Sequence, residues 1–347
     1  MLAKNSRLRL AETARSIFMT PVHTWRHCIV VLCVALAFIL MPQRDPVDWN
    51  LNTEGYWSAF PNSYADPAKV YPPWGLILML PYYWMRAEGA RVASVLVIGW
   101  LAFRRHWTLS RFLAAVLSPY FLTTMSKSNM DIFVFVLPLL LWEAAEGTRW
   151  QSLGRGTAMS LSLLKPQGSL FIWGYWLWCS RKRWKDLIWP LGIVALVTLP
   201  ISLIGSPPLI WQWMQNLLNP SSANAYYWSV NNLSLTSKFG VLPGALIFFL
   251  AASVVGIGVW RGWIRWSRDH VYAALLFSSF FLLPYASQQS SSSAFTLIPS
   301  WPSFLMQWVG ILLGFQLDYW DYIPLYVLFF ATVSMFLYIP RPSPGTG

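Results

Sequence analysis

Apolar runs alternate with short polar intervals along almost the whole chain, from Cys28 to Ile339. A helix needs about 20 predominantly apolar residues to cross the hydrocarbon core of a bilayer. β-barrel spans alternate at period two, and these runs do not. The pattern therefore predicts an all-α, polytopic integral membrane protein. We expect a basic N-terminal segment at 1–26, a single transmembrane domain at 27–340 and a short tail at 341–347.

The composition agrees with this prediction. Hydrophobic residues make up 56% of the chain and charged residues only 11%, whereas soluble domains carry roughly 25% charge. Many of the 23 Trp residues stand near segment ends, as is typical of interfacial belts.

The net charge of +12 comes from basic residues that form short clusters between the apolar runs. Such loops mark the cytoplasmic face of a membrane protein. The clusters lie at 4–26, 104–111, 149–155, 181–185 and 261–268. We therefore predict a multi-pass protein of the plasma (inner) membrane with a cytoplasmic N-terminus, and no nucleic-acid partner, because no basic stripe lies outside the membrane pattern. A signal peptide is disfavoured because Met41-Pro42-Gln43-Arg44 offers no small-residue cleavage site.

Following the basic clusters along the chain predicts about eleven crossings and two long outer loops, at 43–71 and 207–240. Between the first loop and Arg104, we expect 72–85 to lie along or dip into the outer interface and 92–103 to cross. Two crossings there are the alternative. Near the end, 285–293 reads as a polar outer turn, 294–314 as a return to the inside, and 322–339 as a final exit to the outside.

Residues 156–180 have basic clusters at both ends and Lys165-Pro166-Gln167 in the middle. Both ends should then be cytoplasmic, so we predict a hairpin of two short helices with Lys165 at its outer apex. Proline suits that apex because it cannot continue a helical hydrogen-bond ladder. Broken helices at membrane depth are tolerated only where they are enclosed by protein or line a cavity.

The first outer loop holds carboxylates that could act as a general base, which must reach the proton that it removes. Asp48 lies between Val47 and Trp49, whereas Asp45 precedes Pro46 and suits a turn. We favour Asp48 over Asp45. The alternative is that both residues only shape the loop.

A phosphate leaving group needs fixed cations where negative charge develops. Lys165 and Lys127 are the natural candidates on the outer side. Ser126 to Asp131 could instead only cap the following helix, with Asn129 or Asp131 as its N-cap. The three Cys and four His residues are scattered, which predicts no His/Cys metal site.

In this layout the chain resembles the GT-C superfamily of membrane glycosyltransferases, especially the polyprenyl-phosphate-mannose-dependent mannosyltransferases of the family-87 type. The resemblance covers roughly 28–300. The matching pieces, in order, are Asp48, Tyr71-Pro72-Pro73, Asn129-Met130-Asp131, Leu164-Lys165-Pro166, Asn231-Asn232-Leu233-Ser234-Leu235 and the polar break after Leu283-Pro284. Two places depart from the pattern: Ser128-Asn129 stands where relatives often have Gly-Asn, and Ser287-Gln288-Gln289 where they tend to carry Trp or His.

The resemblance implies that a mannose-like sugar passes, with inversion, from a polyprenyl-phosphate donor to the hydroxyl of a glycan or lipid acceptor at the outer membrane face. Asp48 would be the catalytic base, with Asp45 as the second choice. Lys165 and Lys127 would hold the donor phosphate, and Asn129 and Asp131 the head group or a divalent metal. The further substrate-binding residues would be Tyr71, Gln167, Asn231 and Asn232.

Two other functions stay open at this stage. The chain could be a non-catalytic membrane subunit of a larger complex that keeps a GT-C-like fold. It could also be a transporter or flippase, although that function needs a polar path across the membrane and the inner halves of the predicted helices offer few ionisable groups.

Overall fold

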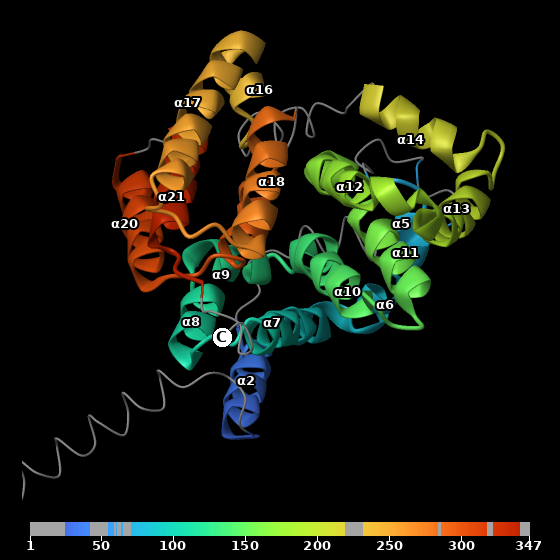
Figure 1. Cartoon of the computed structure of the whole chain (residues 1–347). Coiled ribbons are helices and arrows are strands. Elements are labelled where there is room, and N and C mark those ends of the chain that lie inside the picture. Colours follow the sequence, from blue (N-terminus) through green and yellow to red (C-terminus); the bar gives the residue numbers. More distant parts are fainter. Residues whose placement is uncertain are drawn as a thin grey trace, which may run out of the picture.

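The computed structural model describes residues 25–41, 55–58, 60, 64, 71–218, 232–283, 286–317 and 322–340. In these residues the regular secondary structure is helical, and an isolated β-bridge joins Asn232 and Ser287. Figure 1 shows the helices in one assembly. In chain order they are α2 (Trp25–Ala37), α4 (Gly55–Ser58), α5 (Gly75–Leu78), α6 (Leu80–Trp84), α7 (Arg86–Arg104), α8 (Leu109–Val116), α9 (Pro119–Ser126), η2 (Ile132–Val136), α10 (Leu137–Ala145), α11 (Gln151–Ser162), α12 (Pro166–Ser180), η3 (Arg181–Leu187), α13 (Ile188–Ser202), α14 (Leu209–Leu218), α16 (Leu235–Phe239), α17 (Val241–Trp260), α18 (Arg268–Leu282), η4 (Gln288–Ser290), α19 (Ser291–Phe295), α20 (Trp301–Leu317) and α21 (Ile323–Leu337).

Proline sets where several of these helices begin. Pro119, Pro166 and Pro324 occupy the first turn of α9, α12 and α21. A first-turn proline costs little, because its missing N–H would have no helical partner there and its φ already suits a helix. The apolar runs are therefore divided into shorter helices than their hydropathy alone suggests.

Two helical stretches are long and apolar enough to cross a membrane, Pro166–Ser202 and Val241–Trp260. The side chains of α17 also present a continuous apolar surface, with Leu246, Phe249 and Leu250 all more than half exposed. Such a surface is a liability in water and is what lipid requires. The structure thus supports an all-helical membrane protein. The predicted number of eleven crossings is not confirmed.

Four of the basic loops meet at one end of the bundle, which we call the basic end. Arg105 follows α7 and donates two hydrogen bonds to Glu143 of α10, at 2.8 and 2.7 Å, and one to Asp269 of α18 at 2.5 Å. Arg268 lies 3.7 Å from Glu143. Burial acts to lower the pKa of the Arg105 guanidinium, but its bonds to Glu143 and the charge of Asp269 outweigh burial and raise that pKa.

The predicted break at Lys165 is confirmed. α11 ends at Ser162, α12 begins at Pro166, and Lys165 is the N-cap residue between them. Ser162 joins the two helices across the break. Its carbonyl accepts a hydrogen bond from Ser169 Oγ at 2.6 Å, and its hydroxyl accepts one from Trp173 Nε1 at 2.7 Å.

The helices before and at α7 agree with a single crossing in this region. Residues 72–85 form only the short helices α5 and α6, and α7 is the long element that follows them. α2 packs along α7 with Val31 against Gly99, where a Cβ would lie 2.6 Å from the valine. Arg91 of α7 donates to the Met41 carbonyl at 2.7 Å, so α2 and α7 are antiparallel.

The serine-rich segment was expected to be a polar outer turn, and that expectation is wrong. Ser291, Ser292 and Ser293 are completely buried in α19. Thr124 Oγ1 of α9 lies 3.1 Å from the Gln289 carbonyl oxygen and 2.9 Å from Ser292 Oγ, both within hydrogen-bond distance. Ser292 can enter the core because its hydroxyl bonds to Thr124 of a neighbouring helix, as small polar residues do in membrane bundles.

The last two helices run opposite to the predicted directions. Tyr338, directly after α21, donates to Asp269 at 2.9 Å, so α21 ends at the basic end rather than leaving it. Ser303, near the start of α20, lies 2.5 Å from Ser334, near the end of α21, so α20 begins at the basic end. The chain therefore returns to that end through the buried segment 286–300, which composition had assigned to a turn.

The second predicted loop, 207–240, contains helices where the structure describes it. α14 spans Leu209–Leu218 and α16 spans Leu235–Phe239. Leu209 of α14 is buried, whereas Trp211 and Leu218 are exposed, so the helix also presents apolar side chains outward.

Replacing Arg105 by Met should lower the free energy of unfolding by about 3–5 kcal/mol, because Glu143 and Asp269, both at most 5% exposed, lose their shared cation. Chemical or thermal unfolding in detergent measures the change. Arg104→Met, in the exposed residue next to it, is the matched control. Equal losses in the two variants would contradict the assignment.

Candidate functional site

Lys165 is placed by its backbone. As the N-cap of α12 it has φ −128° and ψ 75°, which interrupts the helical path just before Pro166. Trp74 Nε1 donates to the Leu163 carbonyl at 3.0 Å and so fixes the turn from the α5 side. The lysine side chain therefore leaves a rigid corner in the chain.

The Lys165 ammonium lies in a small charged cluster, the apex cluster, made of Tyr71, Asn129, Asp131 and Lys165. Its Nζ forms an ion pair with Asp131 Oδ1, donates to Asn129 Oδ1 at 3.4 Å, and lies 5.5 Å from the centre of the Tyr71 ring. The Asp131 side chain is completely buried and that of Lys165 is 11% exposed. Burial strengthens the attraction between the two charges because little water screens them.

Asn129 and Asp131 are held by the turn between α9 and η2. Asn129 Oδ1 accepts from the Asp131 backbone N–H at 3.0 Å. Tyr82 of α6 donates to the Ser128 carbonyl at 3.1 Å. Ser128 itself has φ 50°, in the left-handed region that glycine adopts without strain. The position where this chain departs from Gly-Asn is therefore one that favours glycine.

Tyr71 is connected to the surface helix α14. Tyr64 donates to the Tyr71 carbonyl at 2.6 Å, and Asn216 of α14 donates to the Tyr64 carbonyl at 3.2 Å. Trp213 of α14 packs edge-on against Trp74, with ring centres 5.7 Å apart. α14 thus braces both the Tyr71 side and the Trp74 side of the apex cluster.

The cluster has one unsatisfied acceptor. Asp131 Oδ2 is buried and has no hydrogen-bond partner in the described part of the chain. A buried carboxylate oxygen without a donor is costly, so a hydroxyl or N–H donor from a bound molecule would be stabilised there. The site can therefore present an ammonium to an anion and a carboxylate oxygen to a hydroxyl.

A divalent metal does not fit the cluster as it stands. Asp131 Oδ1 and Asn129 Oδ1 both already accept from Lys165 Nζ, and a metal would have to displace that ammonium. Among the described residues there is no group of three or more His, Cys, Asp or Glu side chains that could hold a metal.

The other predicted site residues lie elsewhere. Lys127 is half-buried at the C-cap of α9, and its side chain makes no hydrogen bond or ion pair with described residues. Gln167 is half-buried in the first turn of α12. Asn232 Oδ1 accepts from the backbone N–H groups of Ser234 and Ala286 at 2.9 and 3.3 Å, so it ties two loops together. Asp45, Asp48 and Asn231 lie outside the described residues.

The sequence interpretation missed the residues that support the cluster. Trp74 and Tyr82 bond to backbone carbonyls at the two turns that carry Lys165 and Asn129. Both follow the Tyr71-Pro72-Pro73 motif closely. One feature of the sequence could have indicated them. A tryptophan or tyrosine inside an apolar run usually needs a hydrogen-bond partner for its N–H or O–H group.

Fold and site together describe a helical membrane protein with a charged cluster at a helix break. The family model "Glycosyltransferase family 87" matches residues 70–287. The chain belongs to glycosyltransferase family 87, a GT-C-type family, as the resemblance of its motifs predicted. Neither the curated proteins nor the solved structures give a match. The matched range contains the apex cluster and excludes Asp45, Asp48 and the helices α20 and α21.

Lys165→Met should destabilise the protein by about 3 kcal/mol or more, because it leaves the buried Asp131 carboxylate unpaired. The double variant Lys165→Met/Asp131→Asn should recover much of that loss, since no unpaired charge remains. A double-mutant cycle from unfolding in detergent gives the coupling energy. Additive effects of the two single changes would show that the pair is not energetically coupled.

Ser128→Gly should stabilise the fold by about 1 kcal/mol, because glycine adopts the left-handed backbone without the strain of a side chain. Ser126→Gly, at the end of the neighbouring helix α9, is the control and should destabilise. Thermal unfolding compares the two. A loss of stability in Ser128→Gly would show that the serine side chain matters more than its backbone.

Proposed function

We propose that this glycosyltransferase moves a mannose-like sugar from a polyprenyl-phosphate donor to an acceptor hydroxyl of a glycan or lipid at the outer membrane face. The observation that carries the proposal is the apex cluster. A buried lysine at a helix break, beside an aromatic ring and a carboxylate with one free oxygen, suits a phosphate with a sugar attached.

In this proposal the acceptor oxygen attacks the anomeric carbon of the donor sugar. The bond from that carbon to the phosphate oxygen breaks with its electron pair, and the lipid phosphate leaves. The base takes the acceptor proton, and the configuration at the anomeric carbon inverts. The chain has to supply a cation near the leaving oxygen, a base on the opposite side of the sugar, and groups that fix the sugar.

Lys165 is proposed to stabilise the leaving phosphate. Its ammonium is already oriented by Asp131 and Asn129, so no reorganisation is needed when negative charge develops. The ion pair with Asp131 also stabilises the buried lysine when no sugar donor is bound.

Asp131 and Tyr71 are proposed to fix the sugar. The unsatisfied Asp131 Oδ2 can accept from a sugar hydroxyl, and the Tyr71 ring beside Lys165 can pack on a sugar face. Asp131 is a poorer choice as base, because its other oxygen is engaged by the lysine. Gln167, in the turn after Lys165, and Lys127, Asn231 and Asn232 remain proposed contacts of the donor.

Asp48 is proposed as the base, with Asp45 as the second choice. The loop at 43–71 ends at Tyr71, which lies within the apex cluster. The proposal requires a carboxylate of this loop to act on the side of the sugar opposite the leaving phosphate, as displacement with inversion demands.

Asp48→Asn should reduce sugar transfer by at least 10²-fold, because the acceptor hydroxyl loses its base. Asp66→Asn, in the same loop, is the matched control and should keep most of the activity. Transfer of labelled mannose from a short-chain polyprenyl-phosphate donor to membrane acceptors measures both, after equal expression is verified.

Full activity of Asp48→Asn with loss in Asp45→Asn would reassign the base to Asp45. A wild-type protein that transfers no sugar from any polyprenyl-phosphate donor, and that copurifies in fixed ratio with another membrane protein, would replace the proposal by the non-catalytic subunit.

A further inference from the structure

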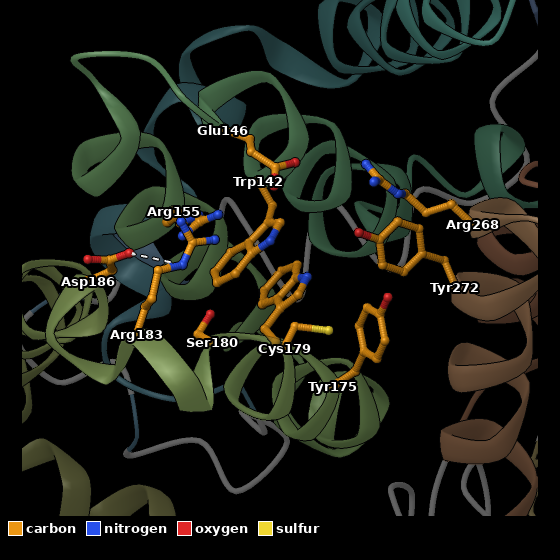
Figure 2. Close-up of a pocket in the computed structure, with 11 residues that line it drawn as sticks. Trp142, Glu146, Arg155, Tyr175, Cys179, Ser180, Arg183, Asp186, Arg268 and Tyr272 are labelled. Carbon is orange, nitrogen blue, oxygen red and sulfur yellow. Dashed lines mark ion pairs between the residues drawn. The ribbon is translucent and has the colours of Figure 1, made fainter. Parts of the chain in front are cut away.

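A polar cavity of about 120 Å³ lies at the basic end and is lined by none of the residues of the apex cluster. α10, α11, α12, η3 and α18 contribute its lining (Figure 2). Trp142 of α10 is one of the lining residues, and it follows Asp131 by eleven positions along η2 and α10, or roughly 15 Å of helix. One ligand head group cannot fill both places.

The most unusual residue in this cavity is Arg155 of α11. It is only 6% exposed, and its guanidinium lies 4.7 Å from the Trp142 ring, which stacks on Trp176 at 4.4 Å between centres. Arg155 Nε is buried without a hydrogen-bond partner, and no carboxylate of the described chain pairs with the residue. Stacking on the Trp142 ring fixes the orientation of the guanidinium plane. The N–H groups at the edge of that plane stay available to a hydrogen-bond acceptor.

The other charges of the cavity are compensated or solvated. Arg183 lies 3.8 Å from Asp186, and both are well exposed. Arg268 lies 3.7 Å from Glu143, and Glu146 is exposed. Figure 2 shows Arg155 and Arg183 on the same side of Trp142, with Arg268 on the other. A buried guanidinium without a counter-charge is costly, so the cavity as a whole lacks an anion at Arg155.

We propose that this cavity binds the phosphate group of an anionic phospholipid from the leaflet at the basic end. A guanidinium edge matches phosphate oxygens geometrically. The volume of about 120 Å³ has room for a phosphate group and falls short of the roughly 300 Å³ that pockets for whole small molecules reach.

The surroundings of the cavity favour a lipid over a soluble anion. The end of α12, η3 and the start of α13 expose Trp178, Trp184 and Trp189, each at least 60% exposed. Arg181 lies over the Trp178 ring at 3.9 Å. Exposed tryptophans beside basic residues mark the level of the lipid head groups, and basic pockets between membrane helices at that level bind anionic head groups.

Cys179 lines the cavity and provides a native probe. The purified full-length protein in maltoside detergent, which carries no phosphate, is treated with a polar maleimide. Phosphatidylglycerol should slow alkylation of Cys179 several-fold, and diacylglycerol with the same acyl chains should not. Cys28 and Cys33, exposed on α2 and outside the cavity, are internal controls.

Arg155→Gln should weaken the protection of Cys179 by phosphatidylglycerol about tenfold, as expected for one lost charge-assisted contact. Arg149→Gln, in the exposed Arg149 of the same basic cluster, should leave protection unchanged. Thermal unfolding verifies that both variants fold. If Arg155→Gln does not fold, the lipid and diacylglycerol comparison on the wild-type protein decides.

Equal protection by phosphatidylglycerol and diacylglycerol, or slowing of Cys28 and Cys33 to the same extent, would overturn the proposal. Inorganic phosphate tested alone should not protect Cys179 at millimolar concentration. Protection by inorganic phosphate without protection by phosphatidylglycerol would overturn the lipid assignment in favour of a soluble anion.

Discussion

The ion pair between Lys165 and Asp131 is the interaction on which the rest of the apex depends. Each charge alone would be expensive at the depth of a helix break, and each is retained because the other lies beside it. The pair also joins two turns, since Lys165 is the N-cap residue of α12 and Asp131 is the N-cap residue of η2. Further contacts support this arrangement. They come from Tyr71, from Asn129 and from the hydrogen bonds that Trp74 and Tyr82 donate to backbone carbonyls. In the proposed reaction, the same buried pair that stabilises this corner of the fold orients the lysine toward the leaving phosphate.

The part of this site that a sequence can predict is the part carried by local rules. Lys165-Pro166 between two basic clusters predicts a break because proline cannot continue a helix, and the structure has that break. Placing Tyr71, Asn129 and Asp131 on the same side as Lys165 followed from counting crossings up to residue 165. What the sequence could not supply is the partner of each charge. Arg105 reaches Glu143 and Asp269, which are 38 and 164 positions away, and no local pattern encodes such a contact.

The error at the C-terminal end has a definite physical cause. Composition treats Ser290 to Ser293 as a hydrated turn, because four hydroxyls in a row would be costly in lipid. In the fold, Ser292 meets Thr124, Ser290 meets Ser287, and Phe295 beyond them stacks on Tyr120. The segment is enclosed by protein and can cross as short, irregular pieces. Treating this segment as a turn left one crossing out of the predicted topology. The two helices that follow, α20 and α21, were therefore assigned the wrong direction. The end of α21 consequently lies at the basic end.

The two ends of η2 and α10 show how one short helical stretch serves two different chemistries. Its first end carries Asp131, which is satisfied by a lysine inside the protein. Its last turn carries Trp142 and Glu143, which face arginines: Arg155 over the indole, and Arg105 and Arg268 at the carboxylate. Among the described residues, a carboxylate oxygen at the first end lacks a donor, and a guanidinium nitrogen at the second lacks an acceptor. In the two proposals a sugar phosphate binds at the first end and a lipid phosphate at the second. The segment between the two ends is lined with buried apolar side chains, such as Val134, Phe135 and Leu139. This apolar layer offers no counter-charge to either end. Each end therefore needs its own polar partner.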